Sequence, residues 1–170
     1  MMLAVVLTPA TAVAGGPAAS AVEPVRASFG SSTFDMSRGW GAANACVVYS
    51  RTRVACYASN QQADAALGYS AAADPLSTSA LAPPSCTSGW LCLYADVNGG
   101  GRRLQFRDEY WNYLSAYGFD RQTSSWRNNQ GTSDAGYLSL YNLSTPYLCG
   151  ANAYAVSMGT YNDQAYAVWG

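Results

Sequence analysis

The stretch "WLCLYADVNGGGRRLQF", residues 90–106, decides the fold class. "WLCLYAD" alternates with the period of two that is expected of a strand, and "RRLQF" alternates again with Leu104 and Phe106 two positions apart. Between them "VNGGG" forms a turn that glycines make without steric cost. Two short strands around a glycine turn predict an antiparallel hairpin.

The rest of the C-terminal half repeats this pattern. Short runs rich in aromatic and β-branched residues follow as "SSWRN", "GYLSLYNL", "AYAVSMG" and "YNDQAYAVWG". Sixteen glycines, thirteen tyrosines and five tryptophans, with only 11% charged residues, favour a turn-rich β-protein. We therefore predict an all-β fold in which two four-stranded Greek keys form a sandwich. The residues expected in its core are Leu91, Leu93, Leu104, Phe106, Trp126 and Leu140.

The remaining chain divides into smaller parts. Its 170 residues are enough for one core and a small appended module. We predict a leader over 1–27, a module over 28–70, a Pro/Ala/Ser-rich linker over 71–85 and the sandwich over 86–170. In the module, "ACVVYSRTRVACY" reads as a hairpin. The helix that follows has a capping box of Ser59 and Gln62, and Gly68 closes it.

The N-terminus resembles an export signal. "MLAVVL" is a short apolar run, and the small residues after it offer cleavage after Ala14 or Ala21. The first positive side chain is Arg26, so the basic region that usually begins a signal peptide is missing. A true start of the protein further upstream stays open. A disordered Ala-rich leader is the alternative. Six apolar residues are too few to cross a bilayer, and we expect a secreted monomer without a membrane span.

Five cysteines are compatible with export. Cys46 and Cys56 flank the predicted hairpin, and Cys86 and Cys92 bracket a short loop, so two local disulfides are expected. Cys149 is then left over. Other pairings stay open, as does a reduced cytosolic protein, which the leader disfavours.

Composition also limits the chemistry. The formal charge is −1, which gives no field to attract nucleic acid. The chain has no histidine, which excludes Ser-His-Asp and Cys-His catalysis and the usual zinc sites. Asp108 and Glu109 are adjacent on a predicted strand, so they point to opposite faces and do not converge on one bond. We do not expect an enzyme.

The aromatic run "YWNYLSAYGF", residues 110–119, has three interpretations. Its side chains Tyr110, Trp111, Tyr113 and Tyr117 are suited to stacking on sugars or to binding a protein. The interpretation that we favour is a crossover that packs over its own sandwich.

The joint pattern "CTSGWLCLYADVNGGGRRLQF" and "YGFDRQTSSWRNN" resembles the secreted actinobacterial peptidase inhibitors typified by Streptomyces metalloproteinase inhibitor, which have a βγ-crystallin-like fold. The resemblance implies an inhibitor that binds a secreted protease through an exposed loop. Candidate loops are 96–103, with Asn98, Arg102 and Arg103, and 142–152 around Pro146. The cysteine-stapled reactive loop of the family has no counterpart here, because only Cys149 lies in that half. The alternative is a non-inhibitory extracellular crystallin-like structural module.

The resemblance also implies a calcium motif in each Greek key, with ligands exchanged between the two. "DRQTSS" keeps Asp120, Ser124 and Ser125, with Arg121 at its second position, and "NDQAYA" lacks the serines. We expect at most one weak site. Its ligands would be Asn162 and Ser124, with carbonyls near Gln164 and charge from Asp163. The alternative, which we favour, is that these residues only close turns.

Overall fold

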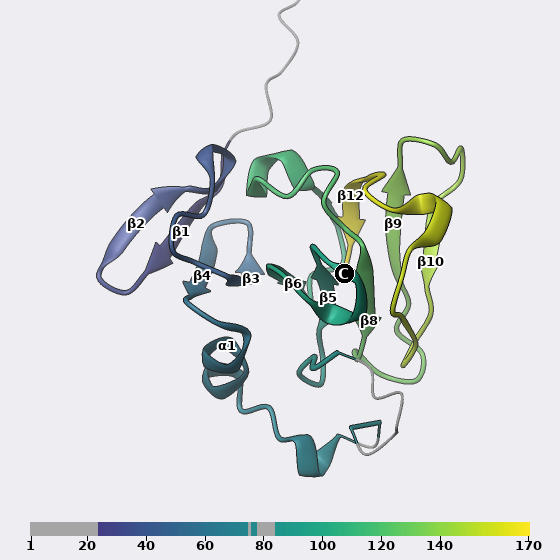
Figure 1. Cartoon of the computed structure of the whole chain (residues 1–170), viewed down its shortest axis with the longest axis horizontal. Helices are drawn as coiled ribbons and strands as arrows, with labels where there is room; N and C mark the ends of the chain where they lie inside the picture. Colours follow the sequence, from purple (N-terminus) through teal and green to yellow (C-terminus); the bar gives the residue numbers. More distant parts are fainter. Residues whose placement is uncertain (1–23, 75, 78–83) are drawn as a thin grey trace, which may run out of the picture.

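The computed structural model describes residues 24–74, 76–77 and 84–170 (Figure 1). Its strands form two sheets, with the orders β11-β8-β5-β6-β3-β4-β1-β2 and β10-β9-β12-β7. Within these described residues, helical structure is confined to α1, Asn60–Leu67, and to short 3-10 turns. The all-β prediction is confirmed. The short 3-10 turns are η1 Met36–Arg38, η2 Ala71–Ala73, η3 Val97–Gly99, η4 Leu114–Tyr117 and η5 Gly159–Tyr161.

The N-terminal strands make two hairpins. β1 (Arg26–Phe29) pairs with β2 (Ser32–Asp35), and β3 (Ala45–Ser50) pairs with β4 (Arg53–Tyr57). Ala27 in β1 is fully buried, although the leader was predicted to extend to residue 27. The strand begins earlier because β1 also pairs with β4, a contact between distant residues. The rest of the predicted leader, 1–23, lies outside the described residues.

The helix α1 follows its local signals. Ser59 Oγ accepts from the Gln62 N–H at 3.2 Å, and Gln62 Oε1 accepts from the Ala58 N–H at 3.1 Å. The C-cap is Gly68, in the left-handed conformation. Each contact joins residues at most four positions apart, so the sequence pattern was sufficient to predict them.

The C-terminal part consists of two Greek keys. In each, the first strand lies between the second and the fourth, and the third strand crosses to the other sheet. The two keys thus exchange β7 and β11. Figure 1 shows β9, β10 and β12 beside β5, β6 and β8. The first key has β5 Leu91–Tyr94, β6 Arg103–Phe106, β7 Trp111–Tyr113 and β8 Ser125–Asn128; the second has β9 Gly136–Leu140, β10 Tyr147–Cys149, β11 Tyr154–Ala155 and β12 Ala165–Trp169.

The core lies between the two sheets. All six predicted core residues are buried, each no more than 4% exposed. They share one cluster with Leu138 and Val168 of the small sheet and with Met36, Trp40 and Tyr117. Burying this apolar surface is the main stabilising contribution to such a sandwich.

The N-terminal hairpins continue the large sheet. β3 runs parallel to β6, with Cys46 opposite Leu104. The predicted module and the predicted sandwich therefore share one sheet. Their division at residues 70 and 86 remains a prediction.

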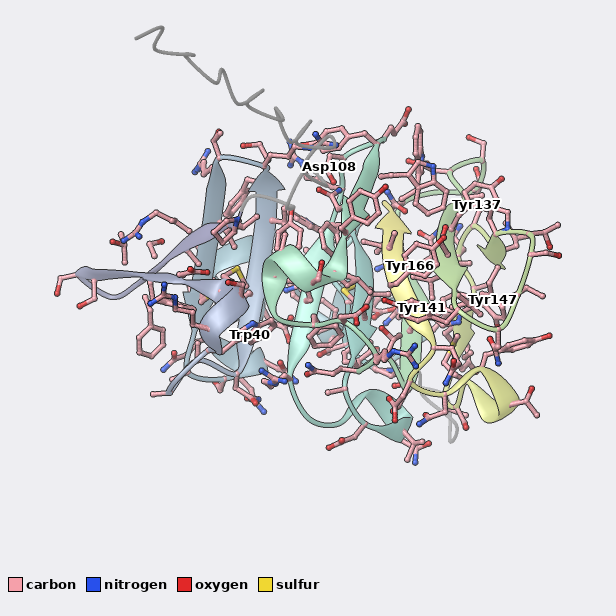
Figure 2. All side chains as sticks on the ribbon, turned by 90° about the horizontal axis from the view of Figure 1, so that it is seen from above. Trp40, Asp108, Tyr137, Tyr141, Tyr147 and Tyr166 are labelled. Atoms are coloured by element: carbon pink, nitrogen blue, oxygen red, sulfur yellow. A yellow bond between two sulfur atoms is a disulfide. The ribbon has the colours of Figure 1, made fainter. Side chains whose placement is uncertain are left out.

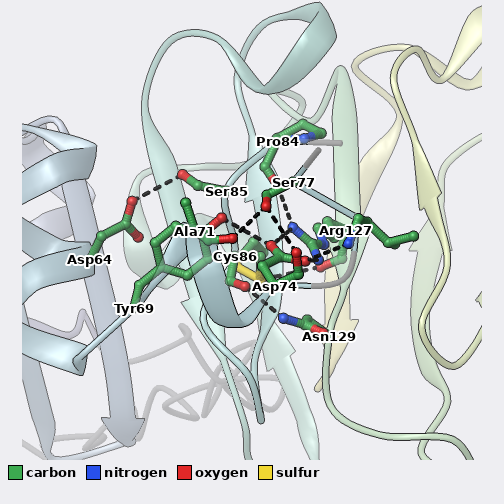
Figure 3. Close-up of polar contacts among 12 residues, drawn as sticks. Asp64, Tyr69, Ala71, Asp74, Ser77, Pro84, Ser85, Cys86, Arg127 and Asn129 are labelled. Atoms are coloured by element: carbon green, nitrogen blue, oxygen red, sulfur yellow. Dashed lines mark hydrogen bonds and ion pairs between the residues drawn. A yellow bond between two sulfur atoms is a disulfide. The ribbon is translucent and has the colours of Figure 1, made fainter. Parts of the chain in front are cut away.

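Two buried ion pairs hold α1 and the segment between these parts on the large sheet. Figure 3 shows the pair of Asp74 and Arg127. Asp64 Oδ1 lies 2.6 Å from Arg103 Nη2, and Asp74 Oδ2 lies 2.6 Å from Arg127 Nη1. Arg103 also donates to the Ser85 carbonyl at 2.8 Å. The described residues at both ends of the predicted linker are thus packed on the large sheet.

Candidate functional site

The glycine turn between β5 and β6 is closed by Ser125. Ser125 Oγ donates to the Asp96 carbonyl at 2.7 Å and accepts from the Gly99 N–H at 3.0 Å. Gly101 has φ 67, and a Cβ there would lie 2.8 Å from the carboxyl carbon of Asp96, so the turn requires glycine. Ser125 therefore has a structural role in this turn.

Part of the first candidate loop, 96–103, is not exposed. Arg103 is fully buried in its ion pair with Asp64, which corrects the prediction that this side chain is available in a loop. Arg102 is half-buried, with its guanidinium 4.9 Å from the ring of Trp40, and hydrogen-bonds to Gln122. Burial lowers the pKa of Arg102. Asn98 remains exposed, beside Val97.

The two crystallin-type motifs pair reciprocally. The Arg121 N–H donates to the Ala165 carbonyl at 3.0 Å, and the Asp163 N–H donates to the Thr123 carbonyl at 3.1 Å. Arg121 and Asp163 occupy the same position in their motifs, and both have positive φ, 53 and 56. The turns are therefore equivalent in backbone structure even where their side chains differ.

The predicted calcium ligands make contacts with one another and with neighbouring turns. Ser124 Oγ lies 3.4 Å from Asp163 Oδ1, so it faces Asp163 rather than Asn162. Asn162 Nδ2 donates to Asp163 Oδ2 at 2.7 Å, and the Gln164 carbonyl accepts from the Tyr141 N–H at 2.9 Å. The described residues contain no group of three or more His, Cys, Asp or Glu side chains that could hold a metal.

Asp120 is hydrogen-bonded to a residue of another turn, Tyr141. Its carboxylate accepts from the Tyr141 hydroxyl at 3.3 Å, and the guanidinium of Arg121 lies 3.9 Å from the ring centre of Tyr141. Tyr141 also packs against Tyr166, with 4.9 Å between ring centres (Figure 2). Calcium takes six to eight oxygen ligands. One carboxylate, one hydroxyl and one amide fit that requirement poorly.

A short strand and the bend that follows it lie at one end of the large sheet. β11 pairs with β8 and is the last strand in the order of its sheet. We call residues 154–157 the edge segment. Within it Val156 is 40% exposed.

The backbone of the edge segment is held on both sides. The Asn98 N–H donates to the Val156 carbonyl at 2.7 Å. Before the segment, the Ala153 carbonyl accepts from the Asn128 N–H at 2.8 Å; after it, the Met158 N–H donates to the Ser124 carbonyl at 2.8 Å. The side chain of Met158 is buried. The sequence predicted a strand here but no site, because its exposure depends on how distant loops pack.

The second candidate loop, 142–152, is not one loop: it contains the connection between β9 and β10, the strand β10 itself and the turn after it. Residues 141–146 make a turn in which the Leu143 N–H donates to the Leu140 carbonyl at 3.3 Å. Pro146 is exposed at its end. Cys149, at the end of β10, is fully buried and is not bonded to another cysteine. The cysteines that are bonded pair as predicted, Cys46 with Cys56 and Cys86 with Cys92.

Comparison with known proteins finds a family that the middle of the chain matches. Residues 79–149 match peptidase inhibitor family I36. The match covers both hairpin strands β5 and β6, the aromatic crossover and the first half of the second Greek key. It confirms the resemblance that the sequence predicted. No match was found among curated proteins.

Two solved structures are similar to the chain. One is a structure from work on the evolution of the eye lens βγ-crystallin domain fold. It is 16% identical in sequence, the similarity covers 51% of this chain and 87% of that chain, and the TM-score is 0.42. The other is a βγ-crystallin from Ciona intestinalis, 20% identical, covering 48% of this chain and 98% of its own, with a TM-score of 0.38. Among the described residues, no helix is long and apolar enough to span a membrane.

Proposed function

We propose that this protein inhibits a secreted protease by presenting its edge segment, residues 154–157, as a substrate-like segment. The observation that carries the proposal is that this segment leaves β11, bends at the exposed Val156 and is held by backbone hydrogen bonds on both sides of Val156. Proteins commonly recognise an extended strand through the free edge of a sheet. The inhibitor-like function itself is supported by the match to family I36.

Rigidity is what would separate an inhibitor from a substrate here. A segment held in its bound conformation loses little conformational entropy on binding. If the protease cut beside Val156, the ends would still be held through Ala153 and Met158. The products would therefore separate slowly. Val156, between Ala155 and Ser157, would offer a small apolar side chain to the specificity pocket.

The protein is proposed to act outside the cell and without catalysis of its own. Its two disulfides suit an oxidising compartment. A protease is accordingly the proposed partner, and no cofactor is required for this activity. Weak calcium binding remains a separate proposal, and it does not contribute to the inhibition.

The test is a titration of thermolysin-type and subtilisin-type proteases with the purified protein. We expect stoichiometric inhibition of one class that persists on incubation. Val156→Asp places a charge in the specificity pocket and should weaken inhibition at least about tenfold. Mass spectrometry of the incubated complex should locate any cleavage beside Val156.

The matched control is Thr145→Asp, which adds the same charge at an exposed position in the β9–β10 turn. It should leave inhibition unchanged. If Thr145→Asp abolished inhibition and Val156→Asp did not, the loop around Pro146 would be the binding element. If neither protease class were inhibited, the proposal would fail in favour of a non-inhibitory crystallin-like structural module.

A further inference from the structure

A cleft lies where the N-terminal strands meet the aromatic crossover. It has a volume of about 500 Å³ and is lined from three directions: by residues 24–26 before and in β1, by Arg51 and Thr52 in the β3–β4 turn, and by β7 and η4. We call it the Arg26–Arg51 cleft. Its volume falls in the range of small-molecule sites.

Two cations line this cleft. Arg26 and Arg51 are among its lining residues, and none of the described lining residues is a carboxylate. Asp35, opposite Arg26 in the β1–β2 hairpin, lies outside the lining but close enough for the charge of Arg26 to lower its pKa. Arg26 Nη2 donates to Thr33 Oγ1 at 3.1 Å, and Arg51 Nη2 donates to the Trp111 carbonyl at 3.0 Å. Within the described part of the chain, neither guanidinium forms an ion pair with a carboxylate. Each guanidinium has five N–H donors, so several remain available for a ligand.

The walls of the cleft are aromatic. Trp111 and Tyr113 come from β7, and Tyr113 is 51% exposed. Tyr117 forms a buried part of the lining, where its hydroxyl donates to Asn112 Oδ1 at 2.8 Å. Tyr117 also packs edge-on against Phe106, with 5.3 Å between ring centres. The cleft thus has a buried, hydrogen-bonded aromatic side chain, Tyr117, on its inside and an exposed one, Tyr113, at its rim.

The cations are also held in place. The Arg51 N–H donates to the Tyr110 hydroxyl at 3.2 Å, and the Arg51 guanidinium lies 4.3 Å from the centre of the Tyr110 ring. The Val25 N–H, beside Arg26, donates to the Ala116 carbonyl at 3.2 Å. These contacts bind three separate parts of the chain together around the cleft. A ligand would therefore meet a largely formed site.

We propose that the Arg26–Arg51 cleft binds a small organic anion, a carboxylate carried on a ring. The carboxylate accepts hydrogen bonds from Arg26 and Arg51, which suit its planar geometry. The ring lies against Trp111 and Tyr113. Two kinds of ligand share this chemistry, a uronic-acid sugar and an aromatic carboxylate. The site is independent of the edge segment and of protease inhibition.

The test is an NMR titration of the full chain, labelled with ¹⁵N. The probes are D-glucuronate and benzoate, with methyl glucoside as the neutral control. We expect at least one carboxylate to shift the amide signals of Arg51, Thr52, Trp111 and Tyr113, with methyl glucoside leaving them unmoved. Saturation by glucuronate alone identifies a sugar site, and saturation by benzoate alone identifies a site for flat apolar rings.

Variants establish that the arginines bind the anion. Arg26→Gln and Arg51→Gln should each weaken binding about tenfold, the loss of charge-assisted hydrogen bonds. Arg53→Gln is the matched control, because it removes the same charge from an arginine that packs on Tyr49 outside the cleft. Arg26→Gln alone decides the question if Arg51→Gln disturbs the fold. The proposal is overturned if neither carboxylate produces saturable shifts at the cleft, or if Arg53→Gln weakens binding as much as Arg26→Gln does.

Discussion

The guanidinium of Arg127 lies 2.6 Å from the carboxylate of Asp74, and each side chain is only 2% exposed. Two hydrogen bonds join them, from Nη1 to Oδ2 and from Nη2 to Oδ1. Tyr69 donates a further hydrogen bond to Asp74 at 2.9 Å. This pair ties the segment after α1 to β8 of the large sheet. Figure 3 shows the contact.

Asp74→Asn should destabilise the protein strongly. Removing one partner leaves the charge of Arg127 buried without compensation, which costs about 3 to 5 kcal/mol. Urea unfolding followed by tryptophan fluorescence measures the loss. The control is Asp35→Asn, which removes an acid that pairs with the exposed Arg38. A change in the Asp74 variant no larger than in the control would show that the buried pair does not anchor this segment.

The same carboxylate makes stability depend on pH. Hydrogen bonds from Arg127 hold the pKa of Asp74 below its ordinary value of 3.8. Its ionised form therefore stabilises the fold above that value, and this contribution is lost as the pH falls through the lower pKa of the folded protein. The free energy of unfolding should drop as the pH falls below about 4. Asp74→Asn should show a shallower drop; an equal slope in both proteins would rule out this carboxylate as a cause.

Cys149 should not react in the folded protein. Its side chain is fully buried, and burial raises the pKa of the thiol well above its ordinary value. At about pH 8, iodoacetamide should modify no cysteine without denaturant, because the thiolate is the reactive form. After unfolding without reductant, peptide mapping should find one modified cysteine, Cys149. A disulfide involving Cys149 would contradict the observed pairing.

Gly118→Ala should be more destabilising than Gly159→Ala. The two glycines have similar φ, 60 and 55, so alanine is strained at both. A Cβ at Gly118 would lie 2.2 Å from the carbonyl oxygen of Met36, whereas at Gly159 nothing lies within 4 Å. We expect about 1 kcal/mol for Gly159→Ala and about 2 to 4 kcal/mol for Gly118→Ala. Equal losses in thermal or urea unfolding would mean that the contact with Met36 does not constrain the turn.

Calcium should barely change the melting temperature. Ser124, Asn162 and Asp163 supply few oxygens and one full charge, which corresponds to an affinity no better than about millimolar. Because binding stabilises by mass action, micromolar calcium should have no measurable effect. A rise of several degrees that Ser124→Ala abolished would instead establish a functional ligand turn.

The candidate functional residues were predicted less well than the strands. The sequence pointed to an exposed loop and to residues that match family motifs, and it placed Arg103 in such a loop. Arg103 is instead buried against Asp64, thirty-nine positions away in the chain. The edge segment and the Arg26–Arg51 cleft were not predicted as sites, because each depends on which distant backbone lies beside it.

The sequence by itself determined the features that short-range chemistry controls. The capping residues of α1 and the alternation of β5 and β6 involve residues close in the chain, so local pattern was sufficient. The two disulfides were expected for the same reason, although other pairings stayed open. Only the tertiary structure decided that β3 pairs with β6, that Asp74 meets Arg127, and that Val156 is held by Asn98. No periodic pattern in the sequence predicts these contacts. They form only where the packing of the fold brings distant segments together and excludes water from the charges between them.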